Sequence, residues 1–247
     1  MILHYDGTFD GFLTAVVTAR AEGLTPDGIV RTLPEQGGLF GELRRIESDP
    51  ERARPFAATL RQRLSAEAWR ILRYAFQADA PEVGMVLFRY LELGERVGRA
   101  LDTMIAHDRV LPAWKLARAV GREAHRFKGL VRFQELEGGV WYATIEPDHR
   151  IVPLIAPHFA ARFADQRWII HDLRRAVAAL FDPGRRETAL LPLEVTGPLP
   201  RSANEVLFRE LWQRYFERLA IAERLNPGLQ RQNLPLKHRR HLPEFER

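Results

Sequence analysis

Residues 112–146 read PAWKLARAVGREAHRFKGLVRFQELEGGVWYATIE, and this stretch decides the fold class. Its first half repeats apolar residues at helical spacing, so we expect a helix over residues 112–127. Its second half places two β-prone runs, residues 130–136 and 140–146, around Glu137-Gly138-Gly139. Such runs around a glycine turn predict an antiparallel hairpin. We therefore predict an α+β fold with a mostly antiparallel sheet packed by several helices.

The length of the hairpin loop determines which side chains share a face. A three-residue loop places every large apolar side chain of the hairpin on one side, whereas a two-residue turn divides them between both sides. One buried face is the better arrangement, so we predict the three-residue loop. The apolar face is then Val131, Phe133, Trp141, Ala143 and Ile145. The other face is Arg132, Gln134, Tyr142 and Thr144.

Shorter patterns predict the rest of the chain. We expect an opening strand and helix that form an N-terminal βα unit, because Asp6 or Thr8 precedes a helical apolar repeat as a capping residue would. Two short strands follow within residues 24–47. The later elements are three or four helices over 51–128, a helix over 152–163, strands over 168–172 and 176–181, and a core helix from Asn204 to Leu219.

The expected organisation is one α+β domain over residues 1–225, with a helical insertion at about 51–128. Residues 226–247 form a basic C-terminal tail, which we expect to be extended because it contains Pro235 and Pro243. The N-terminus lacks a signal-peptide pattern, and no apolar run is long enough to span a membrane. We therefore expect a cytoplasmic protein without a membrane partner.

The chain contains no cysteine, which excludes disulfides, thiolate zinc sites and cysteine-ligated iron–sulfur clusters. It also lacks a phosphate-binding P-loop, a dinucleotide-binding glycine fingerprint and a Gly-x-Ser-x-Gly elbow. We expect no cofactor.

Positive charge is concentrated in two segments. The net charge is +5, yet residues 112–132 carry six Lys or Arg against one Glu, and residues 224–247 carry six against two. Clustered cations are typical of a surface that binds a polyanion, although a solvated helix face and a disordered basic terminus have the same composition. The candidate nucleic-acid-binding residues are Lys115, Arg118, Arg122, Arg126, Lys128, Arg132, Tyr142, Arg231, Lys237, Arg239 and Arg240. Tyr142 would stack on a base if its ring were exposed.

Four residues have side chains suited to acid–base catalysis. They are Glu123, His125, Glu146 and His158. None has the spacing of a known metal motif, so we expect no metal site, and ordinary structural roles explain such residues equally well.

Several motifs together resemble one family. They are YDGTFDGF (5–12), EAHRFKGLVRF (123–133), YATIEPD (142–148), HFAARF (158–163), WIIHD (168–172) and LWQRYF (211–216), with the segment from Arg224 to Gln232. Over nearly the whole chain this pattern resembles the bacterial family labelled “probable DNA metabolism protein”. Members are similar to a domain fused to uracil-DNA-glycosylase-like proteins, or are paired with a radical SAM protein of DNA modification or repair. The resemblance transfers no catalytic residue.

Three functions follow as hypotheses. The first is a DNA-repair protein that binds single-stranded or damaged DNA through its basic surface, while a radical SAM partner performs the chemistry. The second is an enzyme that acts directly on DNA or a nucleotide through a Glu/His site. The third is a scaffold for the partner that does not contact DNA.

Overall fold

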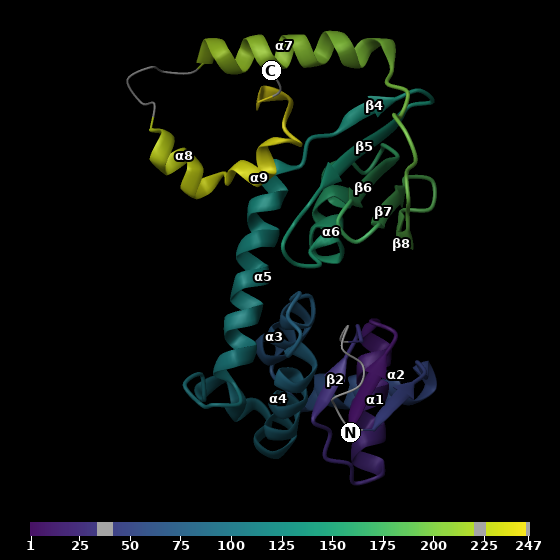
Figure 1. The fold of residues 1–247 in the computed structure, drawn as a ribbon, viewed down its shortest axis with the longest axis vertical. Helices are drawn as coiled ribbons and strands as arrows, with labels where there is room; N and C mark the ends of the chain where they lie inside the picture. The colour runs from purple at the N-terminus through teal and green to yellow at the C-terminus, as the bar shows by residue number, and fades with distance from the viewer. Residues whose placement is uncertain (34–41, 220–225, 246–247) are drawn as a thin grey trace. The chain divides into compact units, whose positions relative to one another are not determined.

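The computed structural model describes residues 1–33, 42–219 and 226–245, and it divides into two compact units (Figure 1). The units are Met1–Arg122 and Glu123–Arg247. The division falls inside helix α5 (Leu111–Leu130), and the C-terminal residues belong to the second unit. The reason is that Gly121 of α5 lies against Tyr74 of the first unit, whereas Glu123 of α5 accepts hydrogen bonds from Asp148 and His149 of the second unit.

The first unit begins with the expected βα unit. Strand β1 (Ile2–Tyr5) precedes helix α1 (Phe9–Ala21), whose N-cap is Thr8, with its hydroxyl accepting a bond from the Gly11 N–H at 2.9 Å. The two short strands expected within residues 24–47 are β2 (Gly28–Val30) and β3 (Leu43–Ile46). Both pair with β1 in parallel, which departs from the antiparallel expectation.

The helices predicted after these strands are present. They are α2 (Pro50–Arg63), α3 (Ala66–Phe76) and α4 (Val83–Val97), then the short η1 (Gly98–Thr103) and α5. Asp49 and Ser65 cap the first two through side-chain bonds to backbone N–H groups. Helix α4 passes so close to β2 that a Cβ at Gly84 would lie 1.9 Å from the Ile29 carbonyl oxygen.

The second unit is built on a five-stranded sheet in sequence order. Its strands are β4 (Gln134–Leu136), β5 (Val140–Ile145), β6 (Trp168–Asp172), β7 (Val177–Asp182) and β8 (Glu187–Pro192). The predicted three-residue hairpin loop is confirmed, because Leu136 pairs with Val140. Three neighbouring pairs are antiparallel, but β5 and β6 are parallel, since helix α6 (Val152–Arg162) returns the chain between them. The sheet is therefore mixed.

The two faces of this sheet differ. Helix α6 packs against β6, β7 and β8 on one face of the sheet (Figure 1). Aromatic rings pack together between this helix and the sheet. These rings are Phe133, Phe159, Phe163, Trp168 and Phe181. The opposite face carries Gln134, Tyr142 and Thr144, as the hairpin register predicted, and it borders the connector of residues 193–202.

Helix α7 (Ala203–Leu219) was predicted as a core helix, and this prediction is wrong. Its predicted core-facing side chains are between 39% and 58% exposed: Leu207, Phe208, Leu211, Trp212 and Tyr215. The helix contacts β4 and the C-terminal turn η3 (Pro243–Phe245). The periodicity correctly grouped these residues on one helix face, but periodicity alone does not supply an element to cover that face.

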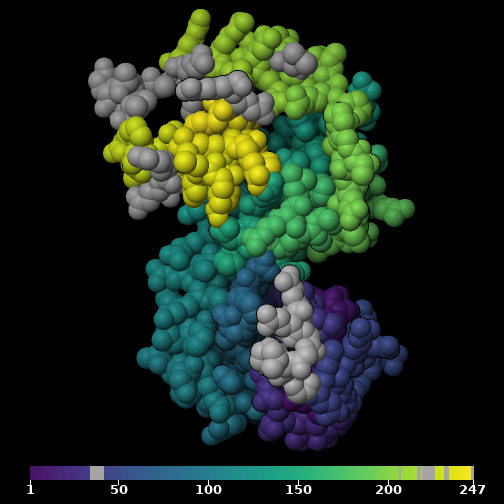
Figure 2. Space-filling view, viewed as in Figure 1, coloured from purple at the N-terminus to yellow at the C-terminus, as the bar shows by residue number. Residues whose placement is uncertain are grey.

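The C-terminal segment is folded, where we expected an extended tail. It forms α8 (Pro227–Asn233), α9 (Leu236–Arg239) and η3. Leu242 is 1% exposed, and the buried His238 ring lies edge-on to Phe127 with centroids 4.9 Å apart. Figure 2 shows these yellow residues against the teal and green surface of their own unit. Throughout the described ranges, every helix is too short or too polar to cross a membrane.

Candidate functional site

The predicted amphipathic helix is confirmed as α5. Its apolar side chains Ala117, Val120, Ala124 and Phe127 are buried. Lys115, Arg118, Arg122 and Lys128 are exposed. Arg118 stacks over the ring of Trp114, 5.1 Å from its centroid. Among the residues that the structure describes, Lys115, Arg122 and Lys128 have no acidic partner, so their charges remain available to an anion.

The cations of the C-terminal segment are instead engaged within the protein. Lys237 Nζ lies 2.5 Å from the Asp148 carboxylate, and Arg240 pairs with Glu146. Arg239 stacks over the ring of Phe245, 4.7 Å from its centroid. The two ion pairs hold the segment against the rest of the unit, and Arg239 is engaged within the segment itself, so the basic composition of the tail does not translate into a free cationic surface.

Two further candidate cations, Arg126 and Arg132, are less exposed than Lys115, Arg122 and Lys128. Arg132 bonds the Glu244 carboxylate at 2.9 Å and the Gly129 carbonyl at 2.8 Å, and its guanidinium lies over the Trp212 ring. Arg126 is half-buried near His238, whose pKa is lowered by burial and, to a smaller extent, by the charges of Lys237 and Arg126. The side chain of Arg231, on α8, lies outside what the structure describes.

Glu123 has a structural role. It is 7% exposed, and its two carboxylate oxygens accept the backbone N–H groups of Asp148 and His149 at 2.7 and 2.8 Å. The carboxylate therefore fixes the loop that follows β5 against α5, and both of its oxygens are occupied. His125, two residues further along, is exposed with the cations of α5.

Glu146 and His158 have different partners. Glu146 pairs with Arg240 and lies 3.5 Å from His241 Nε2. His158 lies on α6 with its ring 5.0 Å from that of Phe159, and burial lowers its pKa with help from Lys128 and Arg162. The structure does not bring the four catalytic candidates into one pocket. No group of three or more His, Asp or Glu suited to a metal occurs in residues 1–33, 42–219 and 226–245.

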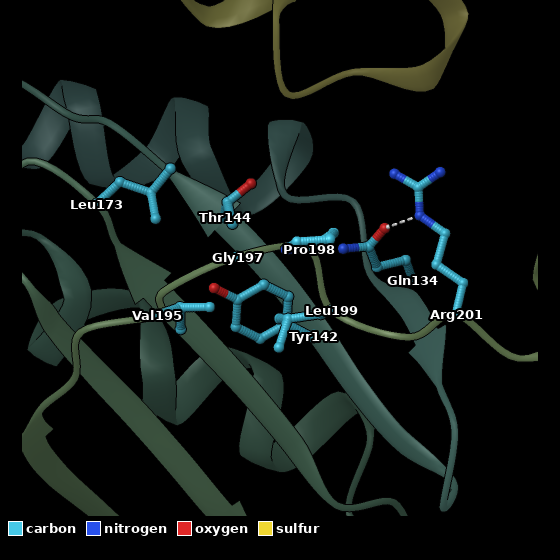
Figure 3. A pocket seen from close by; sticks show the side chains of 9 residues that line it. All are labelled: Gln134, Tyr142, Thr144, Leu173, Val195, Gly197, Pro198, Leu199 and Arg201. Atoms are coloured by element: carbon cyan, nitrogen blue, oxygen red, sulfur yellow. Dashed lines mark hydrogen bonds between the residues drawn. The ribbon is translucent and has the colours of Figure 1, made fainter.

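A cleft of about 630 Å³ opens on the sheet face away from α6 (Figure 3). Its polar groups come from β4, β5 and the connector: Gln134, Tyr142, Thr144 and Arg201. Its apolar wall is Leu173, Val195, Pro198 and Leu199. Gly197, at φ +100°, turns the connector along this wall, in a conformation that favours glycine.

The connector is fixed to the edge of the sheet. The Glu137 N–H donates to the Pro200 carbonyl at 3.1 Å, and the Ser202 N–H donates to the Glu135 carbonyl at 3.0 Å. Arg201 Nε then donates to Gln134 Oε1 at 3.0 Å. Backbone bonds on both sides of Arg201 thus hold its side chain beside Gln134.

The hydroxyl of Tyr142 lies in this cleft and is bonded to a buried histidine. Tyr142 Oη lies 2.6 Å from His171 Nδ1, and the two residues are 4% and 2% exposed. Burial raises the pKa of Tyr142 and lowers that of His171, so both are neutral near pH 7. The exposed ring that base stacking by Tyr142 requires is absent, because the ring packs in the sheet face.

A smaller cavity of about 200 Å³ adjoins the cleft and shares Gln134, Tyr142, Thr144 and Arg201 with it. Three more arginines line it: Arg132, Arg209 and Arg240. Glu205 is the one acidic residue among its lining residues. The β-strand alternation had grouped Arg132, Gln134, Tyr142 and Thr144, but no sequence signal linked them to Arg201, Arg209 or His241.

Comparison with known proteins places the chain in a family. Residues 81–244 match the model of a family described as a domain of unknown function, DUF4130. The chain belongs to this family. No curated protein matches it. The matched DUF4130 range includes all of α5, the five-stranded sheet and every residue that lines the cleft and the smaller cavity, whereas residues 1–80, with the parallel sheet, lie outside it.

Proposed function

We propose that this protein is a DNA-repair or DNA-metabolism factor that binds DNA through the exposed cations of α5. The proposal rests on the contrast between two basic segments. Lys115, Arg122 and Lys128 have no acidic partner in the described parts of the chain, whereas Lys237 and Arg240 are paired with Asp148 and Glu146. An unpaired cation can replace the counterions of a phosphate, and a cation already in an ion pair gains less from doing so.

The spacing of these side chains suits a nucleic-acid backbone. Residues 115 and 122, both on the part of α5 that belongs to the first unit, are seven positions apart, which corresponds to about 10 Å along a helix. Successive phosphates of one duplex strand advance by about 3.4 Å along the duplex axis, so the cations would span several of them. Contacts of this kind position a protein on DNA without reading its sequence.

The chemistry, in this proposal, belongs to a partner enzyme. The family resemblance implies a radical SAM protein, and the present chain has no cysteine with which to ligate an iron–sulfur cluster. Its own role is then to hold single-stranded or damaged DNA. Glu123, His125, Glu146 and His158 give no support to a catalytic role for the chain itself, because each has different neighbours and the four side chains do not meet in one pocket.

The test is a charge reversal on α5 with a matched control. The variant Lys115→Glu, Arg122→Glu, Lys128→Glu changes the net charge from +5 to −1. The control Arg54→Glu, Arg89→Glu, Arg185→Glu makes the same change at exposed positions elsewhere. Binding to labelled single- and double-stranded DNA is measured by fluorescence anisotropy over a salt series.

We expect the α5 variant to lose at least tenfold in affinity and to lower the slope of log K against log salt by about 2 to 3, since each lost phosphate contact removes about 0.7 to 0.9. The control should keep most of the slope. Equal losses in both variants would show that net charge alone attracts DNA. No binding by the unmodified protein at low salt would refute DNA binding and leave the scaffold hypothesis.

A further inference from the structure

We infer that the cleft and the smaller cavity of the second unit form one binding site for a mononucleotide unit, with the heterocyclic base in the cleft and its phosphate at Arg201. This inference goes beyond DNA binding by α5 and does not depend on it. It rests on two adjoining compartments of different chemistry that share four residues.

The larger compartment suits a flat heterocycle. Its volume of about 630 Å³ falls within the range of small-molecule sites. One wall is apolar, formed by Leu173, Val195 and Leu199, and it can cover the face of a ring. A small carboxylate or a free phosphate would leave this wall without a partner.

The polar residues of the lining offer directed hydrogen bonds. Gln134 Oε1 is occupied by Arg201, and Figure 3 shows the Gln134 amide nitrogen turned away from that bond toward the cleft, where it presents donors. Tyr142 is bonded to His171 through its hydroxyl, and a phenol oxygen that makes one such bond keeps an acceptor position. A donor and an acceptor beside an apolar wall match the edge of a nucleobase, which carries both.

These polar groups are fixed before any ligand binds. Tyr142 is 4% exposed and is held at 2.6 Å by a histidine that is 2% exposed, so its hydroxyl has little freedom. Thr144 Oγ1 lies 3.0 Å from His241 Nδ1. A preorganised set of this kind reduces the entropy lost on binding.

The smaller compartment suits the phosphate. Arg201 lies at the junction, because it lines both compartments, and only its Nε is used by Gln134. Among the residues that the structure describes, Arg201 has no acidic partner. Arg209 and Arg240 also line this cavity, and Arg240 is already paired with Glu146, so Arg201 is the arginine that we assign to the phosphate. Arginine is well suited to this task because its guanidinium can bind two phosphate oxygens at once.

The test is calorimetric titration of the full chain with defined probes. These are adenosine and uridine, their 5′-monophosphates, inorganic phosphate, and a short single-stranded oligonucleotide. The main variant is Arg201→Ala. Its control is Arg185→Ala, which removes an exposed arginine of the same unit from the β7–β8 turn, away from both compartments. Gln134→Glu replaces the amide donors by a carboxylate of the same shape. Thermal unfolding of every variant confirms that it folds.

We expect the monophosphates to bind more tightly than the nucleosides and than inorganic phosphate. Arg201→Ala should weaken the monophosphates at least tenfold, about 1.4 kcal/mol, and leave the nucleosides within twofold. Gln134→Glu should weaken both classes, and Arg185→Ala neither. The oligonucleotide separates the sources: tighter binding than the monophosphate assigns the site to a base within a strand, and equal binding assigns it to a free nucleotide.

Three results would overturn the inference. One is inorganic phosphate that binds as tightly as a monophosphate, because the base compartment would then contribute nothing. Another is an unchanged affinity for monophosphates in a folded Arg201→Ala variant. The third is the absence of any heat of binding with monophosphates at millimolar concentration. The charge-reversed α5 variant should keep its affinity for free monophosphates, so failure of the DNA-binding proposal would be visible separately.

Discussion

Replacing Glu123 by alanine should destabilise the second unit while leaving the basic face of α5 in place. The buried carboxylate accepts two backbone N–H groups at 2.7 and 2.8 Å. A hydrogen bond to a charged group contributes about 1.5 to 3 kcal/mol, and its loss leaves a buried N–H unsatisfied. Water that enters the vacated space compensates in part, so we expect a net loss of about 2 to 4 kcal/mol in the free energy of unfolding.

The assay is urea unfolding followed by far-ultraviolet circular dichroism and by tryptophan fluorescence. Two probes are needed because a chain of two compact units need not unfold in one step. Glu123→Gln keeps one acceptor oxygen and should lose about half as much. The control is Glu137→Ala, which removes an exposed carboxylate from the hairpin loop and should change stability by less than about 0.5 kcal/mol. A Glu123→Ala variant as stable as the control would refute the structural role and return Glu123 to the list of catalytic candidates.

Two further predictions concern packing and pH. Gly84→Ala should cost several kcal/mol of stability, because its Cβ would lie 1.9 Å from the backbone oxygen of Ile29. The control is Gly129→Ala on α5, whose Cβ would have nothing within 4 Å and which should be neutral or slightly stabilising. Thermal melts compare the two variants, and equal stability would show that α4 can move away from β2. Burial, with Arg240 and His238 nearby, lowers the pKa of His241 to about 4, so the folded protein binds this proton less readily than the unfolded chain, whose histidine titrates near 6.5. Stability should therefore be independent of His241 above pH 6.5 and fall by about 2 to 3 kcal/mol as the pH drops to 4. Urea titrations at each pH should show a flatter profile for His241→Gln and an unchanged one for the exposed His125→Gln, and a wild-type profile no steeper than that of His241→Gln would contradict the assignment.

Local patterns predicted much of this fold. The helix over residues 112–127, the three-residue hairpin loop and strand β6 are confirmed within three residues, because each depends on the spacing of apolar side chains along a short segment. The grouping of Gln134, Tyr142 and Thr144 on one face followed from the same two-residue alternation. Pairing direction did not follow from it, because alternation is the same in parallel and antiparallel strands, and only the connection through α6 makes β5 and β6 parallel.

What the sequence by itself determined is where positive charge and amphipathic periodicity occur. The tertiary structure decided which of those features remain exposed. Lys237 finds Asp148 across 89 positions of the chain, and Arg132 finds Glu244 across 112. These partners neutralise cations that composition alone counts as free, while the apolar side chains Leu207, Phe208 and Tyr215 of α7 remain exposed. The cleft likewise depends on Arg201, which meets Gln134 across 67 positions of the chain. Ion pairs, buried side chains and clefts between distant segments exist only once the chain has folded.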